Sequence, residues 1–447
     1  MLYYFKDLSL ILFIVLILDV ISMKEDFLHY AWQYRLFAQE NLRTVEGDSL
    51  TVIDVGQRNL DSGPDFFNAK ILIGSTLWAG NVEIHLSASD WYQHAHERDL
   101  CYDTVILHVV WRSDATIYRR NGEIIPQMVL PVSREAIRRK GLFDLGGYWN
   151  QCENFWNELT PQFLNIQLSK MIYERLCRKS IEIFNLMEST KNNWEEVFYR
   201  ILLKSFGMHI NALPFEQLSK SMPFSYLRKH RDNLFQLEAM FLGQASLLGE
   251  DDLDEYQKLL RREYCFLSRK FNLKPIDEKL WKFSKMRPTN FPQIKIVQFA
   301  SLLHHSDNMF SSLLKIKDID ILRNMFRTSP SEYWNTHYQL GKPSIFRPKQ
   351  ISRTTIDLLI INAVVPTIFA YSQYKEDENL MEQAFSFLES LPAEKNRVIK
   401  GWENLGVEVE SAYKSQALIE LKREYCDVRK CLRCGIGHTI LNGGGNS

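Results

Sequence analysis

An excess of charge of either sign is missing from this sequence, because 54 Lys and Arg residues balance 54 Asp and Glu residues. No global electrostatic field therefore steers the chain toward nucleic acid, although charge gathered at one cleft is compatible with this balance. Cysteine is scarce, and the seven residues are odd in number and unevenly spaced, which argues against a disulfide framework. Nucleotide-binding glycine loops, nucleophile elbows, coiled-coil heptads and fixed internal repeats are also missing, so the sequence gives no support to an NTPase, an α/β-hydrolase or a solenoid.

One apolar run stands at the start of the chain. Residues Leu8–Leu18 are nearly all apolar, but the run is too short to cross a bilayer comfortably. It resembles the hydrophobic region of a signal peptide, followed by a poor cleavage site at Val20-Ile21-Ser22. The interpretation that we favour is a mis-assigned start, with Met23 as the true first residue, since the cysteine group near the other end suits a reducing compartment. We therefore expect a cytoplasmic protein without membrane association if Met23 is the true start.

A meander of strands is predicted in the first third of the chain. Three short runs rich in β-branched and aromatic residues, at Leu50–Val55, Phe66–Ile73 and Thr76–Leu86, are separated by Gly, Asp, Asn and Ser. The following segment Ser89–Arg98 has the pattern of a helix, and Thr104–Trp111 predicts another strand. An amphipathic helix is expected before the meander, over residues 24–39.

Three polar side chains in this meander form a candidate metal site. Asp65 opens the second strand, Glu83 lies near the end of the third, and His85 follows two residues later. Because side chains alternate along a strand, Glu83 and His85 point to the same face, and a neighbouring strand can bring Asp65 beside them. Two carboxylates suit Mg²⁺ or Mn²⁺, and a water on such an ion can attack a phosphodiester. We expect Asp65 and Glu83 to bind the metal and His85 to orient the water, so that all three are predicted catalytic residues.

Gly63-Pro64-Asp65, followed after a spacer by Glu83-Ile84-His85, resembles the PD-(D/E)xK motif of the restriction-endonuclease-like nucleases. The resemblance implies a core of helix, three strands, helix and strand, and it implies nuclease activity. It also implies that Glu25 in the preceding helix supplies an additional acid. His85 stands where the family has lysine, and a neutral imidazole does not offer lysine's fixed positive charge to a phosphate. We expect Gln57 or His94 to contact the substrate.

The histidines after the third strand allow a different metal. His85, His94 and His96, together with Asp65 or Glu83, would suit Zn²⁺. On a continuous helix, however, His94 and His96 lie about 200° apart, so only one of them is expected to face the sheet. The remaining alternative is that His85 is an ordinary core histidine, while His94 and His96 decorate a solvated helix.

The periodicity becomes helical after Gly146-Gly147-Tyr148-Trp149. At 447 residues the chain is long for one compact domain. We therefore expect an α+β protein with a restriction-endonuclease-like mixed sheet and flanking helices in a domain over residues 23–145. An all-helical domain over residues 146–424 follows, and a Cys/His knuckle with a tail occupies residues 425–447.

The second chemical signal is the Cys-x4-Cys-x2-Cys-x3-His pattern of Cys426, Cys431, Cys434 and His438. Four such ligands can close a tetrahedral Zn²⁺ site, which would be structural because no coordination position stays open. An iron–sulfur cluster is an alternative, with the fourth ligand either the histidine or a distant cysteine such as Cys152. The third alternative is a set of reduced thiols packed like small apolar side chains.

Several phrases in the chain, among them GPDFFNAKI, GNVEIH, SDWYQHAH, RPTNFP and CLRCGIGH, are similar to a bacterial family known as domain-of-unknown-function family 2851. The similarity covers nearly everything from Met23 onward and implies a shared fold, but it carries no known activity. Two hypotheses follow for function. The first is a metal-dependent nuclease or related phosphodiesterase of the PD-(D/E)xK type. The second is a catalytically inactive scaffold with the same fold, which binds nucleic acid or a protein partner through its helical domain.

Overall fold

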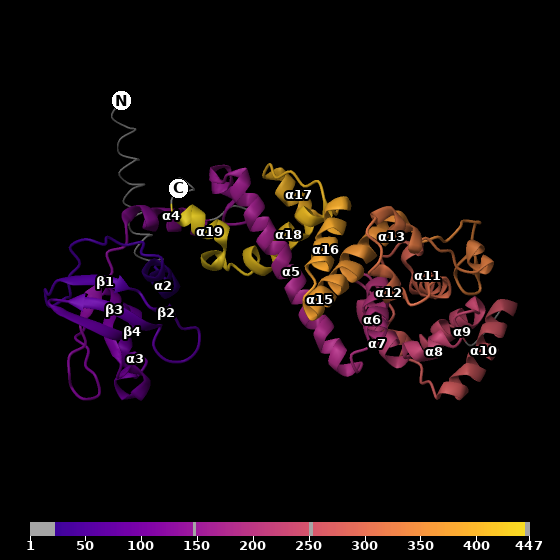
Figure 1. The fold of residues 1–447 in the computed structure, drawn as a ribbon, viewed down its shortest axis with the longest axis horizontal. Coiled ribbons are helices and arrows are strands. Elements are labelled where there is room, and N and C mark those ends of the chain that lie inside the picture. Colours follow the sequence, from indigo (N-terminus) through magenta and orange to yellow (C-terminus); the bar gives the residue numbers. More distant parts are fainter. Residues whose placement is uncertain (1–22, 146–148, 250–253, 443–447) are drawn as a thin grey trace, which may run out of the picture. The chain divides into compact units, whose positions relative to one another are not determined.

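A computed structural model describes residues 23–145, 149–249 and 254–442 (Figure 1). The apolar extension 1–22 and the glycine pair at the predicted domain boundary lie outside the described residues. The chain forms two compact units, of which the first is Met1–Gln167 with Leu421–Ser447 and the second is Leu168–Glu420. The architecture is α+β, because the first unit contains a mixed sheet and the second is almost entirely helical.

The sheet of the first unit contains β1 Leu50–Asp54, β2 Gln57–Arg58, β3 Phe66–Ile73, β4 Thr76–Ser87, β5 Val105–Arg112 and β6 Gln127–Val129. Its order is β1-β3-β4-β5-β6, and β2 pairs with the start of β3. Neighbours from β1 to β4 are antiparallel, whereas β4, β5 and β6 run parallel. A parallel pair needs a crossover, which α3 Asp90–Gln93 and the 3-10 turns η1 His96–Arg98 and η2 Leu100–Tyr102 provide between β4 and β5. The four strands predicted from sequence are thus confirmed to within a residue at their ends.

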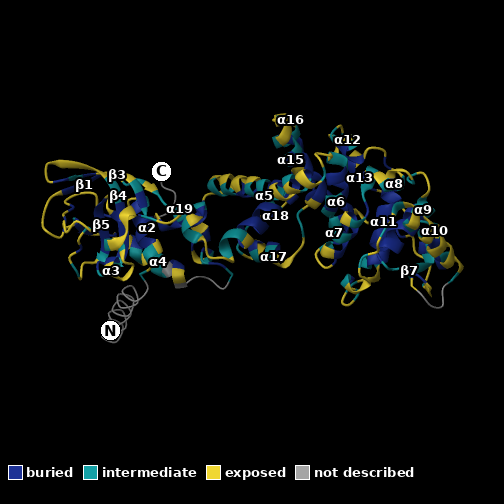
Figure 2. Ribbon diagram, turned by 90° about the horizontal axis from the view of Figure 1, so that it is seen from below, coloured by how far each residue is buried: buried dark blue, intermediate teal, exposed yellow. Residues whose placement is uncertain are grey.

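Burial along the strands explains where polar groups must find partners. All six residues from Val105 to Val110 in β5 are buried, as expected for a strand covered on both faces. The first half of β4 is largely exposed, but Val82, Glu83, Ile84 and His85 are all buried. Figure 2 shows this change from exposed to buried colours within the sheet. A carboxylate and an imidazole inside the protein need hydrogen-bonding partners there, because burial without them is costly.

Helix α2 Glu25–Gln33 packs against β4. It is shorter than the predicted helix 24–39, because Arg35 adopts a left-handed conformation with φ 53° just after the helix ends. Its buried face carries Phe27, Leu28 and Trp32, and the Trp32 indole donates a 3.0 Å hydrogen bond to the carbonyl oxygen of Val55. The helix is therefore anchored both to the core and to the end of β1.

The C-terminal segment belongs to the same unit as the sheet. It contains η8 Lys422–Cys426, η9 Cys431–Arg433 and α19 Gly435–Leu441, and α19 packs against α4 Arg134–Leu145 (Figure 1). Arg139 of α4 donates to the carbonyl oxygen of Ile440 at 3.0 Å. The sequence predicted a separate Cys/His knuckle after residue 424. In the structure this segment is part of the same compact unit as the sheet.

The second unit is a helical assembly with one two-stranded ribbon. Its central helix is α11 Pro292–His304, in which all residues from Pro292 to Leu303 are buried, so that it is covered on every side (Figure 2). The other helices are α5 Pro161–Ser189, α6 Trp194–Phe206, α7 Ala212–Ser221, α8 Phe224–Arg228, α9 Leu234–Gln244, α10 Glu255–Phe271, α12 Met309–Leu313, α13 Ile319–Met325, α14 Arg353–Leu359, α15 Val365–Lys375, α16 Glu378–Ser390, α17 Arg397–Asn404 and α18 Ala412–Leu421. Of these, α5 begins in the first unit and α18 ends in it. The remaining short elements are η3 Glu153–Glu158, in the first unit, and η4 Glu278–Leu280, η5 Pro288–Asn290, η6 Glu332–Thr336, η7 Ile360–Val364, β7 His337–Gln339 and β8 Lys342–Pro343.

One continuous helical stretch, Arg353–Lys375, is long and apolar enough to cross a membrane by length and composition alone. Within the second unit, 78% of its most apolar window is buried by other parts of the protein. That degree of cover is typical of a core helix, which passes the same test of length and composition.

A buried carboxylate holds three segments of the second unit together. Glu238 of α9 accepts hydrogen bonds from the Tyr256 hydroxyl at 2.6 Å, from the Ser331 amide and hydroxyl at 3.1 and 2.9 Å, and from the Trp334 indole at 3.0 Å. Burial raises the pKa of Glu238 above its ordinary value, although these donors act in the opposite direction. The side chain is fully buried and is the acceptor for the Ser331 amide and the Trp334 indole, while the Tyr256 and Ser331 hydroxyls also lie 2.9 Å from each other.

We predict that Glu238→Ala lowers the free energy of unfolding of the second unit by about 3 kcal/mol, because it leaves several buried donors without an acceptor. Urea denaturation followed by tryptophan fluorescence measures the change. The exposed Glu278 provides the matched control, and Glu278→Ala should stay within about 0.5 kcal/mol of the wild type. Equal stability of the two variants would show that the network contributes little.

Candidate metal centre

Two carboxylates lock β3 and β4 together at the point where the strands' regular pairing is interrupted. The register of the β3–β4 pair shifts between Phe66 and Ala69. Beside this irregularity, the Asp65 amide donates to Glu83 Oε2 at 3.1 Å, and the Ile84 amide donates to Asp65 Oδ2 at 2.9 Å. Each carboxylate thus holds the backbone of the other's strand. The second oxygen of Glu83, Oε1, is turned toward a group of histidines.

Three imidazoles converge on Glu83. Its Oε1 atom lies 3.3 Å from His96 Nε2 and 3.5 Å from His85 Nε2. His94 Nδ1 lies 3.2 Å from the same His85 nitrogen. The ligand atoms of the three histidines all lie within 4.8 Å of one another, and they are the only such group of three found among the described residues. His85 is buried, His96 half-buried and His94 exposed, so the group reaches from the core to solvent.

The backbone at Ala95 brings His94 and His96 to the same side. Helix α3 ends at Gln93, and Ala95 adopts a left-handed conformation with φ 57° and ψ 33° before η1 begins. The expectation that only one of the two histidines faces the sheet is therefore wrong, because it assumed a continuous helix. A left-handed alanine is uncommon, and its strain is kept here by the packing of the turns on either side.

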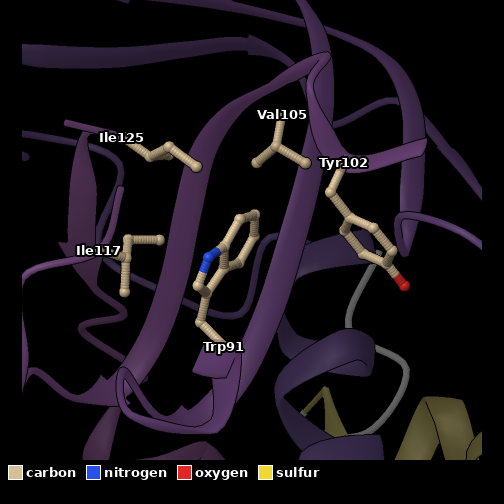
Figure 3. Close-up of a cluster of buried hydrophobic side chains, with 5 residues drawn as sticks. All are labelled: Trp91, Tyr102, Val105, Ile117 and Ile125. Atoms are coloured by element: carbon tan, nitrogen blue, oxygen red, sulfur yellow. The ribbon is translucent and has the colours of Figure 1, made fainter. Parts of the chain in front are cut away.

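Apolar and aromatic side chains pack against the histidine group. Trp91 is packed among Val105, Ile117 and Ile125, as Figure 3 shows, and Tyr102 closes one side of this cluster with its hydroxyl pointing away. The Tyr102 ring stacks on His96 with 3.8 Å between ring centroids. The positions of the imidazoles are thus set by rigid packing and by the sheet together.

His108 of β5 orients His85. Its Nε2 atom lies 2.8 Å from His85 Nδ1, and both rings are buried. When His85 Nδ1 carries the proton, its N–H donates a hydrogen bond to His108 Nε2. The lone pair on His85 Nε2 then faces Glu83 and His94. A hydrogen bond to the second ring nitrogen is the usual way in which proteins fix the tautomer of a metal-binding histidine.

A second acid–imidazole pair lies beside this group. His29 Nε2 of α2 lies 3.0 Å from Asp65 Oδ2. The two side chains form an ion pair when the imidazole is protonated, but the geometry is not that of a hydrogen bond. Arg58 approaches the other ring nitrogen of His29 at 3.5 Å. Glu25, the acid that the nuclease resemblance implied in the first helix, stands one helical turn before His29, which places the two side chains on one face of α2.

Burial and crowding disfavour negative charge on the two glutamates. Burial and then the Asp65 carboxylate raise the pKa of Glu83 to about 9. Burial raises the pKa of Glu25 as well. For His29, burial lowers the pKa, but the contact with the Asp65 carboxylate outweighs it and leaves the pKa above its ordinary value. A cation placed among these groups would relieve the repulsion between the carboxylates.

Burial favours the neutral form of His85, His96 and His108. Burial, followed by the neighbouring histidines, lowers the pKa of His85 to about 3. Burial lowers the pKa of His96, and it holds the pKa of His108 far below its ordinary value. Metal ions bind neutral imidazole, so no proton has to leave these rings at neutral pH before coordination.

The distances fit a single metal ion. Two neighbouring nitrogen or oxygen ligands at about 2.1 Å from one ion are roughly 3.0 Å apart in octahedral geometry and roughly 3.4 Å apart in tetrahedral geometry. Three of the six separations among Glu83, His85, His94 and His96 are 3.2, 3.3 and 3.5 Å. These four side chains could thus hold one divalent cation with little movement. Asp65 lies next to them, but both its contacts are to protein groups.

Gln57, which the sequence suggested as a substrate contact, lies elsewhere. It lines a surface hollow of about 620 Å³ together with Asn68, Trp78, Asn81 and Arg119, and no member of the histidine group lines this hollow. His94, the alternative substrate contact, lies within the histidine group and is exposed to solvent.

Sequence reasoning missed two members of the site. His29 lies four residues after Glu25, and this spacing places both on one face of a helix. That pairing of an acid and a histidine was the available signal. His108 stands in an apolar strand next to β4 and is directly opposite Glu83 in the register. A lone histidine inside such a run gives no signal unless the order of the strands is known.

The predicted C-terminal ligands lie in the first unit. Cys431 Sγ lies 3.8 Å from the side-chain oxygen of Gln151, the residue before Cys152. His438 instead contacts α2, where its Nδ1 atom lies 2.8 Å from the Tyr30 hydroxyl.

No curated protein and no solved structure matches this chain at a significant level. The profile of one family, described as Protein of unknown function (DUF2851), matches residues 25–397. The match includes every side chain of the metal centre described above and ends before Cys426. Because it covers most of the sequence, the chain belongs to this family of proteins of unknown function.

Proposed function

We propose that the first unit is a metal-dependent phosphodiester hydrolase of the nuclease type. The observation that carries the proposal is the spacing of Glu83, His85, His94 and His96, whose ligand atoms lie 3.2 to 3.5 Å from their neighbours. An acid–imidazole pair, Asp65 with His29, borders this group. Acids and imidazoles in this arrangement can bind a metal ion and move protons at a metal-bound water.

Manganese is the metal that suits this set best. Imidazole ligands disfavour Mg²⁺, which prefers oxygen, while a tetrahedral Zn²⁺ would be closed by four protein ligands. Mn²⁺ accepts both imidazole and carboxylate and prefers octahedral coordination, so positions stay open for water and for a phosphate oxygen. Exposure of His94 supports an open side of the site toward solvent.

The residues around the metal would divide the work. Glu83 and the three histidines hold the ion, which supplies an activated water when it is bound. Asp65 holds His29, whose raised pKa favours a protonated ring that can donate to the leaving oxygen. Arg58 brings a guanidinium to the same edge, where it can bind a phosphate oxygen.

The order of elements supports the nuclease class. Helix α2, strands β1, β3 and β4, the α3 crossover and strand β5 follow one another as helix, three strands, helix and strand. This is the order that the PD-(D/E)xK resemblance implies. Asp65 and Glu83 occupy the beginning of the second main strand and the buried half of the third, where that motif has its acids.

An inactive scaffold is the second candidate. The observation in its favour is that the Ile84 amide and His29 both contact Asp65 Oδ2, so this oxygen has a structural role in the sheet. In that case the metal would stabilise the unit, and the protein would bind nucleic acid or a protein partner without cleaving it.

Metal binding is the first prediction. Wild-type protein should bind about one Mn²⁺ in the first unit, and His85→Ala should weaken this by at least roughly 100-fold, since even residues that only support a ligand contribute 10- to 100-fold. Electron paramagnetic resonance of free Mn²⁺ during titration measures the affinity. His209, exposed in the second unit, provides the control, and His209→Ala should bind as the wild type does. Unchanged affinity in His85→Ala would remove the site.

Hydrolysis is the second prediction. Single- and double-stranded DNA and RNA should be cleaved with Mn²⁺, and Glu83→Gln or Asp65→Asn should slow cleavage on the order of 100-fold or more. Asp61→Asn, in the exposed loop before β3, is the matched control and should retain full activity. Binding of nucleic acid without cleavage by metal-loaded wild type would favour the scaffold, and cleavage that survives in Glu83→Gln would assign the activity to another site.

The pH dependence of metal affinity is the third prediction. Glu83 in the metal-free protein has a pKa of about 9, so near neutral pH the cation must displace a proton. The association constant for Mn²⁺ should therefore rise by about tenfold per pH unit between pH 7 and 8.5, with about one proton released for each ion bound. Calorimetry in buffers of different ionisation enthalpy counts the protons. A constant affinity over this range would mean that Glu83 is already ionised.

A further inference from the structure

The surface hollow that Gln57 lines is a second candidate site of the first unit. Its walls come from β2, β3 and β4, from the segment just before β5, from β5 itself and from the loop after it. Its volume is about 620 Å³. Ligand-binding pockets in proteins span roughly 300 to 1,000 Å³, so the hollow has room for a small molecule or for one unit of a polymer.

Two β-bulges flank the hollow, one on each side of β4. Strand β3 places two residues, Phe67 and Asn68, opposite Asn81, and Asn68 adopts a left-handed conformation with φ 57°. Strand β5 places an extra residue, Ile106, between two consecutive pairs with β4. Gly80 of β4 stands between the bulges, where a Cβ atom would lie 2.4 Å from Ile106 Cγ2. The hollow is therefore built into the sheet, and bulges of this kind often lie beside functional sites.

The walls combine an exposed aromatic ring with exposed amides. Trp78 of β4 lines the hollow and is 38% exposed, although it is a large apolar side chain. Gln57 and Asn68 also line it, and both are exposed to solvent. An amide side chain offers both donors and an acceptor. A nucleobase matches this combination, because its face stacks on aromatic rings and its edge pairs with Asn or Gln.

The charges at the hollow are compatible with an anionic strand. Arg119 lines the hollow, and its guanidinium donates to the carbonyl oxygen of Val105 and, at 3.3 Å, to Glu123 Oε2, so its position is fixed. Asp103, the acid among the lining residues, lies 3.3 Å from Arg120 Nη2. Each acid at this place is thus matched by a cation, and the paired charges would not repel a phosphate backbone.

Strand β4 connects the hollow to the candidate metal centre. Both bulges belong to the neighbouring strands, so β4 itself continues regularly, and Asn81 and Glu83 point to the same face. Both side chains reach β3, since the Asn68 amide donates to Asn81 Oδ1 at 3.2 Å and the Asp65 amide donates to Glu83 Oε2 at 3.1 Å. Two residues of a strand span roughly 6.6 Å, so a strand held at the candidate centre can place an adjacent base in the hollow.

We propose that the hollow binds an unpaired nucleobase of a nucleic-acid strand whose neighbouring phosphate lies at the candidate metal centre. Trp78 stacks on the face of the base, and Gln57 and Asn68 bind its edge. The base is unpaired, because a base within a duplex exposes neither its face nor its Watson–Crick edge. The inference rests on the proposed hydrolase function for the place of the phosphate, and it adds a preference for single strands.

The experiment measures binding of a short fluorescein-labelled DNA strand to the full-length protein by fluorescence anisotropy, in EDTA so that no cleavage occurs. The same strand with abasic sites, and a duplex of the same sequence, should each bind about tenfold more weakly, which is the effect of losing one base–aromatic stack. Trp78→Ala should lose about tenfold for the intact strand, and Trp78→Phe should restore most of it. Leu77→Ala is the matched control, because Leu77 is 59% exposed on the same strand but does not line the hollow.

Equal affinity of the wild type for the intact strand and for either the abasic strand or the duplex would overturn the proposal, and this comparison does not depend on the folding of any variant. Unchanged binding by Trp78→Ala would overturn it as well. Displacement of the strand by an equal concentration of adenosine monophosphate would assign the hollow to a free nucleotide instead. Base-dependent binding by a protein that cleaves nothing would support the hollow and remove the hydrolase, whereas cleavage with base-independent binding would do the reverse.

Discussion

The two hydrogen bonds that Asp65 and Glu83 exchange with each other's strands determine the geometry of the candidate metal centre. They occur just beyond the last β3–β4 pair, Phe66 with Val82, so side-chain oxygens accept from amides that a continued ladder would pair. A carboxylate fixed in this way has one oxygen committed to the backbone and one oriented by it. Glu83 Oε1 is therefore presented toward His85 and His96 as a consequence of how the sheet is closed, rather than by a flexible side chain that happens to point there.

The electrostatics of the candidate centre would favour a bound cation. Buried carboxylates are costly unless positive charge compensates them, and the groups nearest Glu83 are another carboxylate and imidazoles whose pKa values are lowered. Protonation of Glu83 relieves this cost in the metal-free protein. A divalent ion relieves it more completely, since it pairs with the carboxylate and uses the lone pairs of rings that are already neutral. Burial thus disfavours the charged forms of these side chains in the metal-free protein, and it would favour their coordination of a cation.

Local patterns in the sequence were sufficient to predict the strands and the two acids, but not how the histidines meet. Runs rich in β-branched and aromatic residues located β1, β3 and β4, and a continuous apolar run located β5. The left-handed conformation of Ala95 has no local signature, since alanine rarely adopts it and tertiary packing imposes it here. The approach of Gln151 to Cys431, far along the chain, is likewise non-local. Both depend on packing between segments that a single sequence does not reveal.

Helix α2 contacts both the histidine group and α19, and this links the C-terminal segment to the candidate metal centre. His29 and Tyr30 are consecutive residues of a helix, so their side chains diverge by about 100°. His29 lies against Asp65, while Tyr30 lies against His438 of α19. A helix held from two sides has less freedom to rotate or shift than one packed on the sheet alone. Displacement of the C-terminal segment would therefore remove the His438–Tyr30 contact and leave α2 held only from the side of the sheet, where His29 lies 3.0 Å from Asp65.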